Sequence, residues 1–216
     1  MPYIIGFVSQ KGGVGKSTLA RAAATKYARE GYRVQLCDLD IQQGTITDWY
    51  RRRLQNKGDP LTSVQCFATV EQALKSSTDL KPAYDVVVID APGRSSDAVR
   101  ALAKIGHVLI QPTSGTLDDL DPAIRLFHEL RNLGIDRRKL LFALMRTTTE
   151  HEEQLARDYI QQAGYRALSN VLYERVGYKT AQNQGLTIIE TTFASLNQRA
   201  ENFLQEVSDY IKLLYS

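Results

Sequence analysis

The sequence predicts one α/β domain built on a single doubly wound, mostly parallel sheet. Short apolar segments rich in β-branched residues alternate with segments of helical periodicity along all 216 residues. Runs that are nearly continuous in apolar residues are typical of parallel strands buried on both faces. A composition of 43% hydrophobic and 24% charged residues is that of a globular protein, and it excludes a disordered chain or a collagen. We therefore expect one domain over residues 1–216.

Six segments are expected to form the strands, joined through helices that make right-handed crossovers. Two helix starts show the spacing of a capping box, at residues 69–72 and 149–152. A third start is expected at Asp121, an N-cap residue followed by Pro122 at the first helical position. The expected strands are residues 3–9, 33–39, 63–67, 84–90, 107–111 and 139–145.

Several features predict a soluble, cytoplasmic chain. Residues 1–6 lack the basic stretch of a signal peptide, and no apolar run approaches the roughly 18–20 residues that span a bilayer. Cys37 and Cys66 stand in strand-like contexts, so we expect buried thiols in a reducing compartment. Residues 196–215 carry an apolar helical stripe and a polar face of mixed sign, which favours packing on the domain over membrane binding.

A glycine-rich loop follows the first expected strand and precedes a helical segment. Its glycines allow backbone N–H groups to turn towards phosphate oxygens, and the helix N-terminus adds positive potential. The Lys16 ammonium can reach β- and γ-phosphates, and the Ser17 hydroxyl can ligate Mg²⁺. The sequence therefore predicts a nucleotide-binding loop made of Lys11, Gly12, Gly13, Val14, Gly15, Lys16, Ser17 and Thr18.

Carboxylates stand at the ends of two other expected strands. Asp90 ends an apolar strand, where it is expected to hold Mg²⁺ through water; capping of the next helix is the alternative. Asp38 and Asp40 end another strand, and Trp49 follows them as a core or interface aromatic.

The Lys-Gly-Gly-x-Gly-Lys-Ser form of residues 11–17 resembles the deviant Walker A motif of the ParA/MinD superfamily. Residues 38–43 are similar to the Asp-x-Asp-Pro-Gln of ParA proteins, with Ile41 in place of the proline. The resemblance covers nearly the whole chain and implies a P-loop ATPase that uses ATP and Mg²⁺. It implies that Lys11 contacts phosphate across a dimer interface and that Asp40 positions the attacking water. Asp38 is expected near the metal or in a purely structural role, and Arg146 at the adenine.

Because the first strand begins at Tyr3, the chain resembles the short ParA ATPases of plasmid partition, without an N-terminal helix-turn-helix. The resemblance implies a homodimer formed on ATP binding, non-specific DNA binding on the nucleoid, and hydrolysis stimulated by a small centromere-binding, ParB-like partner. Turnover without the partner should be slow, since no catalytic glutamine or glutamate stands beside the loop. The resemblance assigns DNA contacts to Arg175 and Lys179; charge alone adds Arg137, Arg138 and Lys139, which are otherwise a solvated surface.

Four other functions remain open. A ParA-like ATPase that positions a non-DNA cargo on the nucleoid fits the same residues. A MinD-like membrane ATPase requires a basic amphipathic C-terminal helix, which the mixed-sign face disfavours. An iron–sulfur reductase requires cysteines near the switch segments, and Cys37 and Cys66 lie within expected strands. A P-loop kinase or synthetase shares the fold, but no residue pattern marks an acceptor site.

Overall fold

The computed structural model describes residues 2–61, 63–79, 84–93 and 96–215. A seven-stranded sheet in the order β3-β2-β4-β1-β5-β6-β7 forms its centre, and every strand pair is parallel. The doubly wound α/β fold expected from the sequence is therefore confirmed. The strands are β1 (Tyr3–Phe7), β2 (Val34–Asp38), β3 (Ser63–Cys66), β4 (Val86–Asp90), β5 (Val108–Thr113), β6 (Leu140–Leu144) and β7 (Arg166–Ala167).

All six expected strands are present, and β7 is an additional one. It has two residues and pairs with β6 at the end of the sheet, through Leu141 opposite Arg166 and Phe142 opposite Ala167. A strand this short carries no periodic pattern, so the sequence offered no signal for it. Ala167 packs against the core on the α3–α6 side, and the Arg166 guanidinium lies 5.0 Å from the centroid of the Tyr210 ring.

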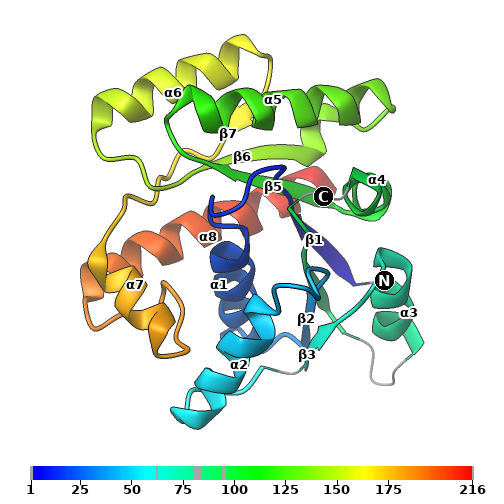
Figure 1. Cartoon of the computed structure of the whole chain (residues 1–216), viewed down its shortest axis with the longest axis vertical. Coiled ribbons are helices and arrows are strands. Elements are labelled where there is room, and N and C mark those ends of the chain that lie inside the picture. Colours follow the sequence, from blue (N-terminus) through cyan, green and yellow to red (C-terminus); the bar gives the residue numbers. More distant parts are fainter. Residues whose placement is uncertain (1, 62, 80–83, 94–95, 216) are drawn as a thin grey trace.

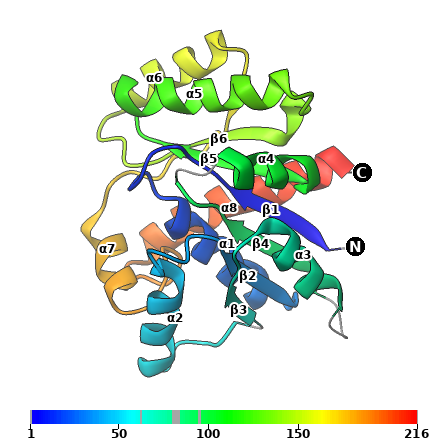
Figure 2. The same ribbon diagram turned by 45° about the vertical axis from the view of Figure 1, so that its right-hand side comes forward.

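Helices cover both faces of the sheet (Figures 1 and 2). One core lies between the sheet and α1, α2, α7 and α8, and the other lies between the sheet and α3–α6. Gly6 on β1 allows a close approach on the second face, because a Cβ there would lie 2.6 Å from Leu102 Cδ2. The helices are α1 (Lys16–Arg29), α2 (Thr45–Gln55), α3 (Val70–Asp79), α4 (Ser96–Ile105), α5 (Leu117–Asn132), α6 (Glu150–Gln162), α7 (Val176–Asn183) and α8 (Ala194–Tyr215).

Both expected capping boxes begin helices. The Thr69 hydroxyl accepts a hydrogen bond from the Gln72 amide at 3.2 Å ahead of α3, and Thr149 accepts one from the Glu152 amide at 3.1 Å ahead of α6. These bonds satisfy amide groups that have no partner within the helix, which is why the spacing predicts the start.

The start expected at Asp121 is wrong, because α5 begins at Leu117 and contains Pro122. A proline inside a helix leaves the carbonyl four residues earlier without its amide donor. Here that carbonyl belongs to Asp118, and the Lys11 ammonium donates to it at 3.3 Å. A long-range contact thus satisfies the acceptor that the proline leaves free, and local sequence rules do not contain such a contact.

The C-terminal helix α8 packs on the domain, as its apolar stripe predicts. Phe203, Leu204, Val207 and Ile211 are buried in the core on the α1 side of the sheet. Figure 1 shows α8 in red and orange, crossing beside α1. Among the described helices, none combines the length and apolar character needed to cross a lipid bilayer.

One of the two cysteine predictions is wrong. Cys37 is buried in β2, and burial raises the pKa of its thiol. Cys66 is exposed, because β3 is an edge strand and lacks a covering strand on one side. Its sulfur lies 3.0 Å from the Thr47 hydroxyl.

Candidate nucleotide-binding site

The loop before α1 adopts a backbone that glycine favours. Gly13 has φ 79° and Gly15 has φ 108°, both in the left-handed region that side chains with a Cβ rarely occupy. A Cβ on Gly15 would also lie 2.8 Å from the Met145 sulfur. Gly15 is the N-cap of α1, so the first amides of this helix point into the space above the loop. The sequence motif therefore corresponds to an anion-binding backbone.

This loop lines a cavity of about 230 Å³ at the carboxyl edge of the sheet. Most of the residues predicted to bind nucleotide or metal line this cavity. Val14 and Asp38 are buried and do not line it, and the Lys11 side chain is directed away from it, towards Asp119. The lining also contains Arg21, Gln43, Thr45, Ala91 and Gly93, which the sequence did not assign. The predicted residues on the lining are Gly12, Gly13, Gly15, Lys16, Ser17, Thr18, Asp40, Asp90 and Arg146.

Ser17 and Asp90 form a pair suited to a hard cation. The Ser17 hydroxyl donates to Asp90 Oδ2 at 2.6 Å, while Oδ1 is buried and has no hydrogen-bond partner among the described residues. Burial raises the pKa of Asp90 to about 7, although the Ser17 bond and the Lys16 charge act in the opposite direction. A buried carboxylate with a free oxygen beside a hydroxyl fits Mg²⁺. Within the described residues no group of three acidic, histidine or cysteine side chains gathers, so other ligands would come from phosphate and water.

Asp38 holds the turn that carries Asp40. Its Oδ1 accepts a hydrogen bond from the Asp40 amide at 2.9 Å, and its Oδ2 accepts one from the Ile46 amide at 3.2 Å. Burial raises the pKa of Asp38, and these two bonds oppose the rise. Asp38 lies opposite Asp90 in the β2–β4 register, so it is beside the predicted metal position. Asp40 itself is half-buried and lines the cavity.

Lys11 does not enter the cavity of its own chain. Its ammonium lies 2.5 Å from Asp119 Oδ1, and its side chain is 47% exposed. Together with the bond to the Asp118 carbonyl, this pair attaches Lys11 to the first turn of α5.

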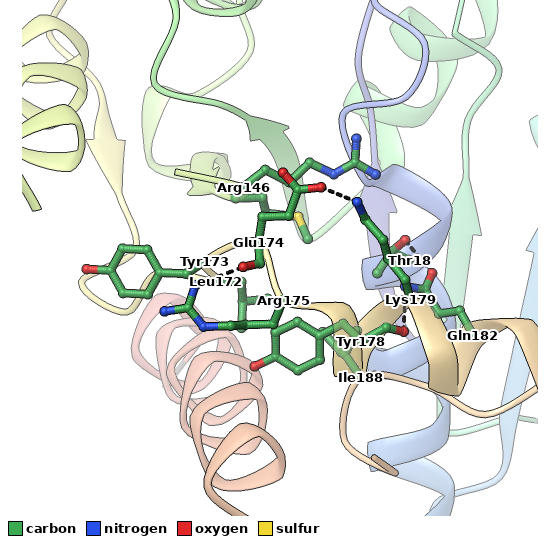
Figure 3. A pocket seen from close by; sticks show the side chains of 11 residues that line it. Thr18, Arg146, Leu172, Tyr173, Glu174, Arg175, Tyr178, Lys179, Gln182 and Ile188 are labelled. Carbon is green, nitrogen blue, oxygen red and sulfur yellow. Dashed lines mark hydrogen bonds and ion pairs between the residues drawn. The ribbon is translucent and has the colours of Figure 1, made fainter. Parts of the chain in front are cut away.

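A second pocket adjoins the loop and lies between β6 and α7 (Figure 3). Arg146, at φ 60°, donates to the Gly13 carbonyl and lines both the cavity and this pocket. The Thr18 hydroxyl donates to Gln182 Oε1 at 2.8 Å and so ties the loop to α7. Figure 3 shows the Arg146 guanidinium directed towards the loop, beside the other side chains that line the pocket.

The candidate DNA contacts lie on two separate surfaces. Arg175 and Lys179, at the start of α7, line the second pocket, and Lys179 forms an ion pair with Glu174. Arg137, Arg138 and Lys139 form a short 3₁₀ helix before β6, at the opposite, amino edge of the sheet. Arg138 pairs with Asp136 at 2.7 Å, and the Lys139 ammonium donates to the Gly106 carbonyl at 3.1 Å.

Sequence reasoning missed Arg21. It lies on α1 four residues after Ser17, lines the cavity, and donates from Nη2 to the Thr45 carbonyl at 2.6 Å. The available signal was a single cation within the run Leu19–Ala24 of otherwise apolar residues.

Known proteins resemble this chain in sequence and in fold. The family model of the CobQ/CobB/MinD/ParA nucleotide binding domain matches residues 5–188. Protein VirC1 of Rhizobium radiobacter is 28% identical over 127 residues, covering 57% of this chain and 54% of that protein. The match thus spans about half the length of this curated relative.

Solved structures extend the similarity over nearly the whole chain. A putative plasmid partition protein of Borrelia burgdorferi bound to AMPPNP has TM-score 0.76 at 19% identity, covering 97% of this chain and 99% of that one. The septum site-determining protein MinD of Pyrococcus horikoshii, complexed with Mg-ADP, has TM-score 0.70 at 19% identity, covering 99% and 97%. These two similarities show a shared fold. Because the family model covers most of the sequence, this chain belongs to the CobQ/CobB/MinD/ParA family of nucleotide-binding domains.

Proposed function

We propose that this chain is a partition-type ATPase that binds Mg·ATP in the cavity, dimerises on ATP and binds DNA without sequence preference. Hydrolysis is slow until a ParB-like, centromere-binding protein stimulates it. The observation that carries the proposal is the convergence of Lys16, the Ser17–Asp90 pair and Asp40 on one cavity of about 230 Å³. One nucleotide-binding domain over residues 1–216, associated with the nucleoid, is part of the proposal.

The residues divide the chemistry between binding and positioning. Loop amides and Lys16 bind the β- and γ-phosphates and stabilise the charge that develops on the transferring phosphoryl group. Asp40 accepts a hydrogen bond from a water molecule and directs its oxygen at the γ-phosphorus. A new P–O bond then forms as the bond to the ADP oxygen breaks. Ser17 and Asp90 would hold Mg²⁺ with Asp38 beside them, and the ion neutralises phosphate charge when bound.

Lys11 would act in the partner subunit's cavity. Its exposed ammonium is attached to α5 outside its own cavity, which supports a role between subunits once the pair with Asp119 opens. ATP binding and dimerisation are then one event. Arg146 lines the second pocket, from which it would contact the adenine.

DNA binding rests on the basic residues near the nucleotide. Arg175 and Lys179 are exposed; Lys179 lies on α7 and Arg175 directly before it, and Thr18 joins this helix to the phosphate loop. This connection supports a nucleotide-dependent DNA surface, whereas the 3₁₀-helix residues 137–139 lie at the other edge. The similarity to a structure described as a putative plasmid partition protein supports a DNA cargo.

The decisive experiment measures binding to random-sequence duplex DNA with ATP, with ADP and without nucleotide, over a range of salt concentrations. Wild type should bind only with ATP, and Lys11→Ala should not bind. Lys179→Gln should lower the slope of log affinity against log salt by about 1, whereas Arg137→Gln should leave it unchanged. Absence of DNA binding in every state, with ATP still hydrolysed, would point to a cargo other than DNA.

The MinD-like alternative has specific support in the shared fold. It requires a C-terminal helix that is free to lie on a membrane. The apolar stripe of α8 is buried against the domain, which favours the DNA proposal over this alternative. Co-sedimentation with anionic vesicles distinguishes the MinD-like alternative from the DNA proposal. The DNA proposal expects that the protein does not sediment with the vesicles.

A further inference from the structure

A buried cation adjoins the phosphate cavity and does not belong to the loop motif. Arg21 is 7% exposed, and its Nε has no hydrogen-bond partner among the described residues. Burial lowers the pKa of Arg21 to about 10, with the Asp90 charge opposing the change, so the guanidinium is protonated at neutral pH. A charge with an unpartnered donor is costly to bury.

The contacts of Arg21 join two helices of the site. The residue stands on α1 in the helical position next to Ser17, because a spacing of four places both on one face. Its Nη2 donates to the carbonyl of Thr45, the first residue of α2, at 2.6 Å. The guanidinium carbon also lies 5.5 Å from the centroid of the Trp49 ring. Arg21 therefore connects the phosphate-binding helix to the beginning of α2.

Helix α2 is anchored firmly at its far side. Arg53 is fully buried, lies 5.5 Å from the same Trp49 ring, and donates to both carboxylate oxygens of Glu190 at 2.7 and 2.8 Å. Trp49 Nε1 donates to the Leu186 carbonyl at 3.0 Å. These bonds fix α2 to the segment after α7, so the Arg21 contact sets the position of its first turn relative to α1.

The turn that leads into α2 begins at Asp40. The Gly44 amide donates to the Asp40 carbonyl at 3.0 Å, and Thr45 follows directly. Asp38 holds the Asp40 and Ile46 amides from the sheet side, while Arg21 holds the Thr45 carbonyl from the α1 side. Hydrogen bonds from both sides thus hold the turn from Asp40 to Thr45 between β2 and α1.

We propose that Arg21 is a positioning residue that holds the Asp40–Thr45 turn against α1 and so sets the place of Asp40 at the γ-phosphate. This inference rests on the proposed ATPase function. Because Arg21 lines the cavity that the nucleotide fills, ATP binding changes its surroundings and, through the ring contact, those of Trp49.

The test compares Arg21→Met, which removes the charge and the donors, with Arg21→Lys, which keeps a cation and a donor. Arg125→Met, an exposed arginine of α5, is the matched control. Four quantities are measured: the ATP dissociation constant by calorimetry, kcat by phosphate release, the melting temperature, and tryptophan emission with and without Mg·ATP. The emission reports on Trp49 alone, because the sequence contains one tryptophan.

Arg21→Met should lower kcat about tenfold or more while the ATP dissociation constant changes less than about threefold. Arg21→Lys should give an intermediate kcat, and the nucleotide-induced change in Trp49 emission should shrink in Arg21→Met. If Arg21→Met does not fold, a severalfold lower kcat of Arg21→Lys at unchanged affinity supports the proposal, and a wild-type kcat of that variant overturns it.

Other results separate the possible failures. A folded Arg21→Met with wild-type kcat overturns the positioning role and leaves the proposed ATPase function intact. A loss of ATP affinity that matches the loss of kcat also overturns it, since Arg21 would then bind phosphate directly. Wild type that hydrolyses no ATP in the presence of Mg²⁺ overturns the proposed function and this inference together.

Discussion

The Lys11 ammonium and the Asp119 carboxylate lie 2.5 Å apart, so the lysine proposed to act between subunits is paired within its own chain. On the proposed role of Lys11, forming the dimer requires that this pair open. Asp119→Asn should therefore favour the dimer, by about two- to fivefold in the dimer dissociation constant, since a pair with a half-exposed lysine contributes little. Sedimentation velocity with ATP measures the effect. Asp121→Asn, on the same helix, is the control, and an unchanged or weaker dimer in Asp119→Asn contradicts the pairing.

Asp40→Ala should separate binding from chemistry. The change removes the carboxylate proposed to direct the water, while Asp38 continues to hold the backbone of the turn. We expect ATP binding and dimerisation to persist and kcat to fall about a hundredfold. Phosphate release and calorimetry provide the two measurements. Asp48→Ala, an exposed position on α2, should keep wild-type turnover. Normal turnover in Asp40→Ala would remove Asp40 from the mechanism.

Asp90→Asn should stabilise the nucleotide-free protein and abolish the effect of Mg²⁺ on ATP affinity. Burial raises the pKa of Asp90 from 3.8 to about 7, so wild type loses stability as pH rises through this window and the carboxyl ionises. Asparagine does not ionise, so the gain in stability of Asp90→Asn over wild type should reach its full value above about pH 7. Melting curves at pH 5 and pH 8, without metal, measure this. An equal shift at both pH values would contradict the explanation, and Asp97→Asn is the surface control.

Glu190→Gln should destabilise the protein by about 3–5 kcal/mol, because it leaves the fully buried Arg53 guanidinium unpaired. Burial alone would raise the pKa of Glu190, but the bonds and charge of Arg53, with the Thr187 bonds, lower it below 4.5. The contribution of the pair is thus complete above pH 4.5 and is lost as pH falls through the lowered pKa. Urea unfolding from pH 7 to pH 3 measures the free energy of unfolding of wild type and Glu190→Gln. The difference between the two should become smaller as the pH falls. Arg29→Gln, which removes the exposed partner of the same carboxylate, should cost under about 1 kcal/mol.

The sequence predicted those features of the fold and the site that depend on interactions between residues close together in the chain. The strand β4 is apolar and ends at Asp90, and the loop of Gly13 and Gly15 needs left-handed backbone, so both were visible in the sequence. Pro122 misled the prediction because the Lys11 ammonium, from a distant part of the chain, satisfies the carbonyl that the proline leaves free.

The missed parts of the site share that cause. Arg21 contacts Thr45 and Trp49, and Gln182 accepts a hydrogen bond from Thr18. All of these partners are distant in sequence, so the residues around Arg21 and Gln182 do not predict that either belongs to the site. The exposure of Cys66 depends on β3 being the edge strand, which is a property of strand order rather than of composition.

The strand order also determines when each strand can pair while the chain is being synthesised on the ribosome. Strand β1 is synthesised before the two strands that flank it, β4 and β5, and Phe7 pairs with Asp90 and Ile110. At about 5–20 residues per second, translation takes roughly 4–17 seconds to reach the first of these partners after β1 has been made. During that interval an apolar strand has neither neighbour available. Nascent chains stalled before β4 should therefore recruit chaperones that bind extended apolar segments, whereas chains stalled well after β5 should have buried β1.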